Sequence, residues 1–247
     1  MPLVLYHNAR GVTLSIRDRV RRSEFETFVA VVPTRRRLRH LTREIIRSVP
    51  GLTVPALPLH TLGSLATLIF QNIFGPRRIV EGPVQALLFD GAVKVCAQEL
   101  RYFALGSRDA RMSRGTFEKI VDVINNLKES GIYPETLKEE ISSAEMDEQQ
   151  KLREIAAIYE AYDVSLDAMS AVDSGGLFKL LRLHCTEAQF ERSFRTLLPR
   201  VNIISLAGFD EFTEPELEFI RKLCAVHDLS VHALRHEDRQ VSDVKHT

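Results

Sequence analysis

The sequence contains no tryptophan, and its aromatic content is only 7%. Proteins that hold single-stranded nucleic acid by stacking its bases need aromatic side chains, so this composition argues against a surface built mainly on stacking. No apolar run of about 18 residues is present, which argues against a membrane-spanning helix. The N-terminal stretch MPLVLYHNARG lacks a basic start followed by a long apolar core, so it does not resemble a secretory signal.

Cysteine is also scarce. Cys96, Cys185 and Cys224 lie far apart, and their spacing matches no metal-binding motif. A small, odd number of scattered cysteines is typical of a reducing compartment, so we expect a cytoplasmic protein with no bound metal. No Ser/His/Asp arrangement, pair of catalytic carboxylates or nucleophilic cysteine stands out, and we expect no catalytic residue.

The charges balance to a net of zero, but they are unevenly distributed. Residues 1–47 contain eleven arginines and four acids, whereas residues 131–187 contain five basic and twelve acidic residues. An arginine-rich N-terminal part indicates an anionic partner such as nucleic acid. The alternative is that both regions simply face solvent or each other.

Apolar runs near both ends of the chain are typical of buried strands, and helical periodicity fills most of the stretch between them. The predicted strands are residues 2–6, 28–32, 201–207 and 229–234, with an extended segment at 52–59. The predicted helices are 12–22, 35–49, 62–74, 83–105, 113–130, 134–142, 147–169, 176–184, 188–197 and 213–226. This order predicts an α/β fold with a parallel sheet and a large all-helical insertion, the core being 1–80 and 199–247 and the insertion 81–198.

The stretch VNIISLAGFDEFTEPEL, residues 201–217, joins a buried-strand pattern to two acids and a helix start. Asp210 and Glu211 would emerge at the carboxyl end of a parallel strand, where α/β sheets bind their ligands. Two acids in that place can hold Mg²⁺ beside a nucleotide. Alternatively, they help to cap the helix that Thr213 begins.

The connection after the first predicted strand reads HNARGVTLS, which we interpret as a loop at residues 7–11. A phosphate-binding loop needs several glycines, then a lysine and a hydroxyl residue. Here Gly11 is the single glycine, no lysine is present, and Arg10 is a weak electrostatic substitute. We therefore interpret the segment as a plain strand-to-helix turn.

Two further helix starts carry groups that suit phosphate. TRRRLRHLTR, beginning at Thr34, places several arginines at the amino end of a helix, and His60, Thr61 and Ser64 open the next one. Such contacts would hold a nucleic-acid backbone without reading its sequence. The alternatives are a solvated basic face for the first segment and ordinary helix capping for the second.

Four segments in order, VVPTRRRLRHL, LHTLGSLA, GIYPETL and IISLAGFDEFTEPELEFI, resemble the N-terminal helicase-like region of the AddB/RexB-type subunit of bacterial helicase–nucleases. That region belongs to the superfamily 1 helicases and includes members with an inactivated motor, such as the RecC-type subunit. The resemblance covers about residues 1–235. It is strongest at GFDEFTEPEL, where Asp210 and Glu211 match the magnesium-binding acids of the second helicase motif, although Thr213 and Glu214 replace the usual Gln-Asp.

The resemblance implies a P-loop NTPase-like fold, with a 1A-type core and a 1B-type insertion. The active motors of the family carry Gly-Lys-Thr in the first loop, which HNARGVT lacks, so Arg10, Gly11, Asp210 and Glu211 would be a vestigial nucleotide site with no bound cofactor. ATP and Mg²⁺ would be expected only if the motor were intact. The segments that contact DNA in the family correspond here to these residues: Thr34, Arg35, Arg36, Arg39, His60, Thr61 and Ser64.

The resemblance also implies a role in double-strand-break processing and recombinational repair. The expected partners are DNA, as a single strand or a duplex end, and a second helicase–nuclease subunit, with no membrane. Family members continue into a second motor domain and a nuclease domain, so we expect this chain to be a fragment, and not itself catalytic, of an ATP-dependent exodeoxyribonuclease subunit. Two alternatives remain, an ATP-dependent helicase domain with an atypical phosphate loop and a protein-interaction module.

Overall fold

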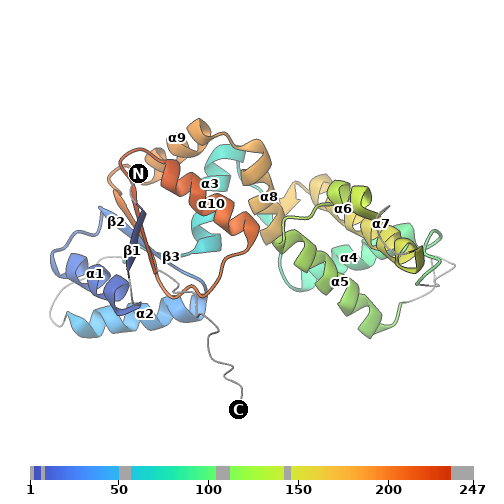
Figure 1. Ribbon diagram of the computed structural model, residues 1–247, viewed down its shortest axis with the longest axis horizontal. Helices are drawn as coiled ribbons and strands as arrows, with labels where there is room; N and C mark the ends of the chain where they lie inside the picture. Colours follow the sequence, from blue (N-terminus) through green and yellow to red (C-terminus); the bar gives the residue numbers. More distant parts are fainter. Residues whose placement is uncertain (1–2, 7–8, 50–56, 104–111, 142–145, 235–247) are drawn as a thin grey trace, which may run out of the picture. The chain divides into compact units, whose positions relative to one another are not determined.

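The computed structural model describes residues 3–6, 9–49, 57–103, 112–141 and 146–234 (Figure 1). The chain divides into two compact units. The first unit comprises Met1–Ile69, Glu187–Phe212 and Ile220–Thr247, and the second comprises Phe70–Thr186 and Thr213–Phe219. Helix α9 (Glu187–Leu197) thus belongs to the first unit, whereas the sequence assigned it to the insertion.

The first unit contains a five-stranded sheet in which every pair of neighbouring strands is parallel. In spatial order the strands are β1 (Leu3–Tyr6), β7 (Ser230–Leu234), β6 (Ile203–Leu206), β2 (Phe28–Val32) and β3 (Leu59–Thr61). All five residues of β2 are buried, as expected for a strand that is covered on both faces. The predicted α/β class with a parallel sheet is confirmed.

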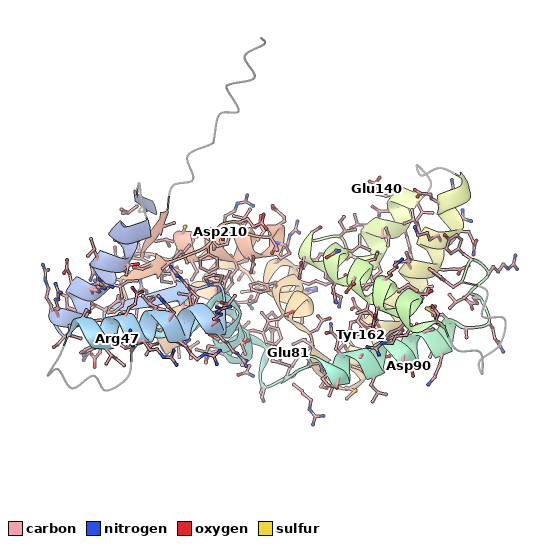
Figure 2. The ribbon with its side chains drawn as sticks, turned by 90° about the horizontal axis from the view of Figure 1, so that it is seen from below. Arg47, Glu81, Asp90, Glu140, Tyr162 and Asp210 are labelled. Atoms are coloured by element: carbon pink, nitrogen blue, oxygen red, sulfur yellow. The ribbon has the colours of Figure 1, made fainter. Side chains whose placement is uncertain are left out.

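Helices cover both faces of this sheet (Figure 1). On one face, α1 (Ala9–Arg21) and α2 (Arg35–Ser48) pack against alternate residues of β2. Arg47, labelled in Figure 2, lies on the exposed side of α2. The opposite face is covered by α9 and by the parts of α3 (Leu62–Phe74) and α10 (Glu214–Ala225) that belong to the first unit. The apolar cluster beneath α1 and α2 includes Ile16, Val20, Phe28, Ala30, Val32, Leu41 and Ile45.

The second unit is mainly helical and has its own apolar core. Its helices are α4 (Pro83–Cys96), α5 (Arg114–Glu129), α6 (Pro134–Glu140), α7 (Met146–Ala168) and α8 (Ser174–His184). Helices α4 and α7 pack together through Phe89 and Tyr162, whose stacked rings have centroids 3.8 Å apart. A short parallel pair, β4 (Arg78–Ile79) and β5 (Ala171–Val172), precedes α4 and α8.

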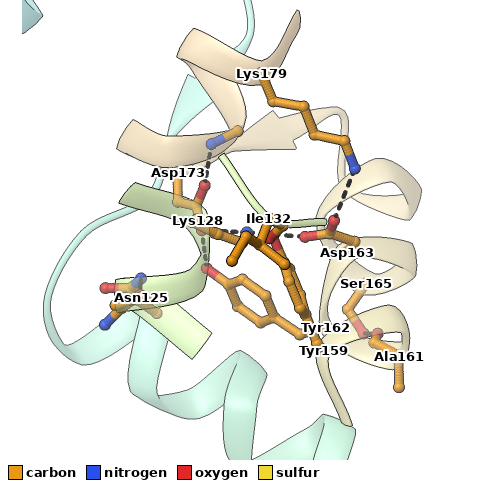
Figure 3. A network of polar contacts seen from close by, with 12 residues as sticks. Asn125, Lys128, Ile132, Tyr159, Ala161, Tyr162, Asp163, Ser165, Asp173 and Lys179 are labelled. Carbon is orange, nitrogen blue, oxygen red and sulfur yellow. Dashed lines mark hydrogen bonds and ion pairs between the residues drawn. The ribbon is translucent and has the colours of Figure 1, made fainter. Parts of the chain in front are cut away.

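A buried ion network joins α5, α7 and the start of α8 (Figure 3). The Lys128 ammonium lies 2.7 Å from an Asp173 carboxylate oxygen and 2.8 Å from one of Asp163. The Tyr162 hydroxyl donates to Asp173, which also accepts the backbone N–H of Gly176 and so caps α8. Every charge in this network has a partner, which is the condition under which buried ions are tolerated.

Three details of the sequence prediction were wrong. The insertion is not all-helical, because β5 lies within it. The helix predicted for 83–105 ends at Cys96, since the buried Glu154 carboxylate accepts the backbone N–H groups of residues 101–103 and holds them in a turn. The loop predicted for 7–11 is shorter, because α1 begins at Ala9. Residues 52–56 of the predicted extended segment lie outside the described residues, and the strand there is Leu59–Thr61.

Within the described residues, no helix combines the length and the apolar character that crossing a membrane requires.

Candidate functional site

In the sheet of the first unit, the connections that follow two neighbouring parallel strands, β2 and β6, lead to opposite sides of the sheet. After β2 the chain runs through α2 to β3 on one side, and after β6 it runs through α10 to β7 on the other. The carboxyl ends of these strands are level, because Val31 pairs in register with both Leu206 and His60. Open α/β sheets bind ligands at such a point, so the carboxyl edge of β6, β2 and β3 is the candidate site.

Helix α2 begins at this edge. Its N-cap is Thr34, whose hydroxyl oxygen accepts the backbone N–H of Arg37 at 3.2 Å. The remaining N–H groups of the first turn have no partner within the helix, which makes the end of α2 attractive to anions. Arg35 and Arg36 are exposed in this first turn, and Arg39 follows one turn later.

Helix α3 begins at the same edge, after β3. The backbone N–H of Thr61 donates to Ser64 Oγ at 2.9 Å, and the backbone N–H of Ser64 donates to Thr61 Oγ1 at 3.1 Å. The Ser64 hydroxyl is 3.5 Å from His60 Nδ1. The structure thus brings three of the predicted contact residues together, with Thr61 and Ser64 capping the helix as the alternative reading proposed.

His60 differs from the arginines in its charge. Burial lowers the pKa of its imidazole, so His60 is neutral at pH 7 and offers hydrogen bonds and no positive charge. It also lines a largely apolar hollow together with Phe25, Pro58 and Val201.

Arg37 is a residue of this site that the sequence analysis did not identify. A Cβ placed on Gly208 would lie only 2.9 Å from Arg37 Nε, so the guanidinium group of α2 packs directly on the backbone that follows β6. Gly208 has a φ of 77°, which also favours glycine. Arg37, which is exposed, therefore places a positive charge beside the backbone that follows β6. Arg37 precedes the buried Leu41 by four residues and the buried Ile45 by eight. This helical spacing places Arg37 toward their side of α2 and could have been read from the sequence.

Asp210 and Glu211 follow β6 at this edge, and both are exposed (Figure 2 labels Asp210). The capping bond at the start of α10 comes from elsewhere, since the Thr213 backbone N–H donates to Glu216 Oε2 at 3.0 Å. The two acids are therefore not required for that cap. The described residues contain no group of three or more His, Cys, Asp or Glu side chains arranged to hold a metal ion.

The predicted vestigial nucleotide residues Arg10 and Gly11 belong to the first turn of α1, and their side chains lie outside the described residues. Only two residues, 7 and 8, separate β1 from α1. Strand β1 is also at the edge of the sheet, with β7 between it and β6. The arginines and hydroxyls of α2 and α3 are thus grouped around β2 and β3, while Arg10 and Gly11 follow a different strand.

A family model described as "ADDB, N-terminal" matches residues 10–245, which is nearly the whole chain. No curated protein matches the chain significantly.

Proposed function

The chain belongs to the AddB N-terminal family, and on that premise we propose that it is an inactivated helicase-like domain that binds a DNA strand without hydrolysing ATP. Membership points to an AddB-type subunit of a DNA-repair helicase–nuclease and to a partner subunit. We further propose a P-loop NTPase-like core, a role in double-strand-break processing and recombination, and a cytoplasmic setting. The three cysteines, all unbridged, support that setting.

The observation that carries DNA binding is the pairing of two helix starts at one sheet edge. Parallel strands β2 and β3 are neighbours, and each leads directly into a helix whose amino end points the same way. Neighbouring strands lie about 4.8 Å apart, so both helix starts lie near one stretch of the sheet edge, where a single nucleic-acid backbone can contact both. Thr34, Arg35, Arg36 and Arg37 supply the first contact, and Thr61 and Ser64 supply the second.

The connection between β1 and α1 supports the loss of ATP hydrolysis. A phosphate-binding loop places a glycine-rich segment of several residues between strand and helix, and its lysine reaches the terminal phosphates. Two connecting residues leave no room for such a segment, and residues 7–13 contain no lysine. Asp210 and Glu211 would then be the remains of a magnesium site that has lost its nucleotide.

The test of DNA binding is fluorescence anisotropy with a labelled 20-nucleotide oligo(dT) across a salt series. Replacing Arg35 and Arg37 by Gln should lower the salt slope for the single strand by about 1.4, since each lost phosphate contact removes about 0.7. The matched control replaces Arg21 and Arg200 by Gln, two arginines already paired with Asp18 and Glu26. Equal losses in both variants would mean that net charge alone accounts for binding.

The test of the inactive motor is a thermal melt with and without ATP and Mg²⁺. The proposal expects no rise in Tm, because a ligand stabilises only a protein that binds it. A rise that Asp210→Ala abolishes would instead establish a nucleotide site, and the ATP-dependent helicase would become the better assignment.

One observation favours a second function, that of docking the partner subunit. Val84, Leu87 and Val95 are exposed on one face of α4, and a Cβ on Gly91 between them would meet no atom within 4 Å. An apolar helix face of this kind suits a partner helix. Leu87→Glu combined with Val95→Glu should weaken co-purification with the partner helicase–nuclease subunit while leaving oligo(dT) binding unchanged, and an unaltered complex would exclude this surface.

A further inference from the structure

The arginines of α1 and α2 differ in how their charges are matched. On α1, Arg17 pairs with Glu44 at 3.2 Å, Arg19 with Glu24 at 3.1 Å and Arg21 with Asp18 at 3.5 Å. Helix α2 carries six arginines and no lysine, and its single acid, Glu44, is already engaged by Arg17 and His40.

The exposed cations of α2 have no carboxylate partner among the residues that the structure describes. Arg36, Arg39, Arg43 and Arg47 are exposed, and no ion pair joins any of them to an acid in that part of the chain. Like charges at this spacing repel one another and destabilise an isolated helix by some tenths of a kcal/mol per pair. Because this repulsion between the exposed arginines lowers the stability of the free protein, it indicates that α2 binds an anion from another molecule.

Three of these arginines form a stripe along the helix. Arg36, Arg43 and Arg47, with His40 between them, recur at intervals of four, three and four, so they share one face, opposite the buried Leu41 and Ile45, and Arg39 lies beside that face. Arg36, Arg39, His40 and Arg43 line an open hollow on that face. From residue 36 to residue 47 the stripe extends for about 16 Å, at 1.5 Å per residue.

The chemistry of the stripe favours phosphate over other anions. Guanidinium groups bind phosphate through two parallel hydrogen bonds, which lysine cannot do. The stripe contains no tryptophan, tyrosine or phenylalanine, so it lacks the large aromatic platforms on which proteins stack the bases of a single strand. A duplex, whose bases are already stacked and whose phosphates face outward, fits such a surface better than a single strand. About 16 Å corresponds to about five phosphates along one strand of B-DNA.

We propose that the outer face of α2, formed by Arg36, Arg39, His40, Arg43 and Arg47, binds the phosphate backbone of duplex DNA, separately from the single strand held at the carboxyl edge. This inference rests on the proposed function, because it makes α2 the element shared by the two DNA paths. The amino end of the helix contacts the single strand, and Arg43 and Arg47, two and three turns further on, contact the duplex alone.

The experiment compares a blunt 20-base-pair duplex with 20-nucleotide oligo(dT) in the same anisotropy assay. Arg43→Gln combined with Arg47→Gln should lower the duplex salt slope by about 1.8, at about 0.9 per contact. It should weaken duplex binding by ~60-fold at 0.1 M salt if the two contacts contribute nothing at 1 M. Oligo(dT) binding should be unchanged. The same control, Arg21→Gln with Arg200→Gln, removes two acid-paired charges and should leave both ligands nearly unaffected.

Three outcomes would overturn the proposal: equal duplex losses in the two double variants, unchanged duplex binding, or parallel losses for duplex and oligo(dT). Binding to anionic phosphatidylserine vesicles that the Arg43/Arg47 variant loses, with duplex binding intact, would assign the stripe to a lipid surface. Because both residues are exposed and glutamine is a good helix former, circular dichroism should show no loss of Tm, and relief of the charge repulsion should raise it slightly. If the Arg35/Arg37 variant keeps oligo(dT) binding while the Arg43/Arg47 variant loses the duplex, the edge site fails and the stripe stands.

Discussion

The contact between Arg37 and Gly208 predicts a measurable coupling between the two sides of the candidate site. Gly208→Ala places a methyl group 2.9 Å from Arg37 Nε, which is closer than real Cβ contacts allow, so the guanidinium group must move. The substitution also forces alanine into the left-handed region at φ 77°, which costs about 1–2 kcal/mol by itself. We expect displacement of Arg37 to add about 0.5–1 kcal/mol, giving a total loss of about 1.5–3 kcal/mol.

A double-mutant cycle with Arg37→Ala separates these two contributions. In the Arg37→Ala background the clash is absent, so Gly208→Ala should cost only the backbone strain, and the coupling energy should equal the missing 0.5–1 kcal/mol, a size typical of residues in contact. Urea denaturation followed by circular dichroism measures all four proteins. In the oligo(dT) assay, Gly208→Ala should weaken binding in the wild-type background and add nothing once Arg37 is removed. Stabilities that add within about 0.3 kcal/mol would refute the contact, and equal DNA affinities would refute its role in binding.

Further predictions concern the buried polar groups. Lys128→Met leaves Asp163 and the buried Asp173 without their shared cation, and should cost about 3–5 kcal/mol in urea denaturation at pH 7. Glu154→Ala removes the acceptor of three backbone N–H groups and should cost about 3–5 kcal/mol, whereas Glu154→Gln, which keeps one acceptor oxygen, should cost less. Burial, and then the positive charge of Arg19, lower the pKa of His232 in the folded protein, so the stability that neutral His232 contributes is complete above pH 6.5 and is lost as the pH falls below it. His232→Gln should therefore lose less stability than wild type between pH 7 and pH 5, and parallel pH profiles would contradict this.

The sequence predicted the class of fold because each element carried its own signal. The apolar runs at 28–32 and 201–207 lack polar alternation, and both became central strands. The helix predicted at 62–74 was found with the same bounds, since Thr61 caps it and Gly75 and Pro76 end it. Elements that depend on distant contacts were missed. The turn after Cys96 is fixed by Glu154, more than 50 residues away, and β4 and β5 are too short to show a pattern of their own.

The candidate site shows the same division between local and distant information. The capping roles of Thr34, Thr61 and Ser64 were predicted correctly because helix caps are local and readable. Arg37 was missed because its importance depends on Gly208, which lies far away in sequence and becomes a neighbour only through the pairing of β2 with β6. That the exposed arginines of α2 have no acidic partner among the described residues was equally invisible, because the sequence does not show that Glu44, the acid of their own helix, is paired with Arg17.

The order of the strands would let such a domain lose nucleotide hydrolysis and keep DNA binding, as we propose. A nucleotide loop would follow β1, whereas the helices proposed to contact DNA follow β2 and β3. Strands β1 and β3 are at opposite edges of the five-stranded sheet, four strand spacings apart, which is about 19 Å. Changes in the short β1–α1 connection therefore need not disturb the amino ends of α2 and α3, whose geometry is set by the register of β2 with β6 and β3. A longer glycine- and lysine-containing loop inserted between residues 6 and 9 should therefore leave the oligo(dT) affinity in the anisotropy assay unchanged. A change that shifts the register of β3 should abolish oligo(dT) binding in the same assay.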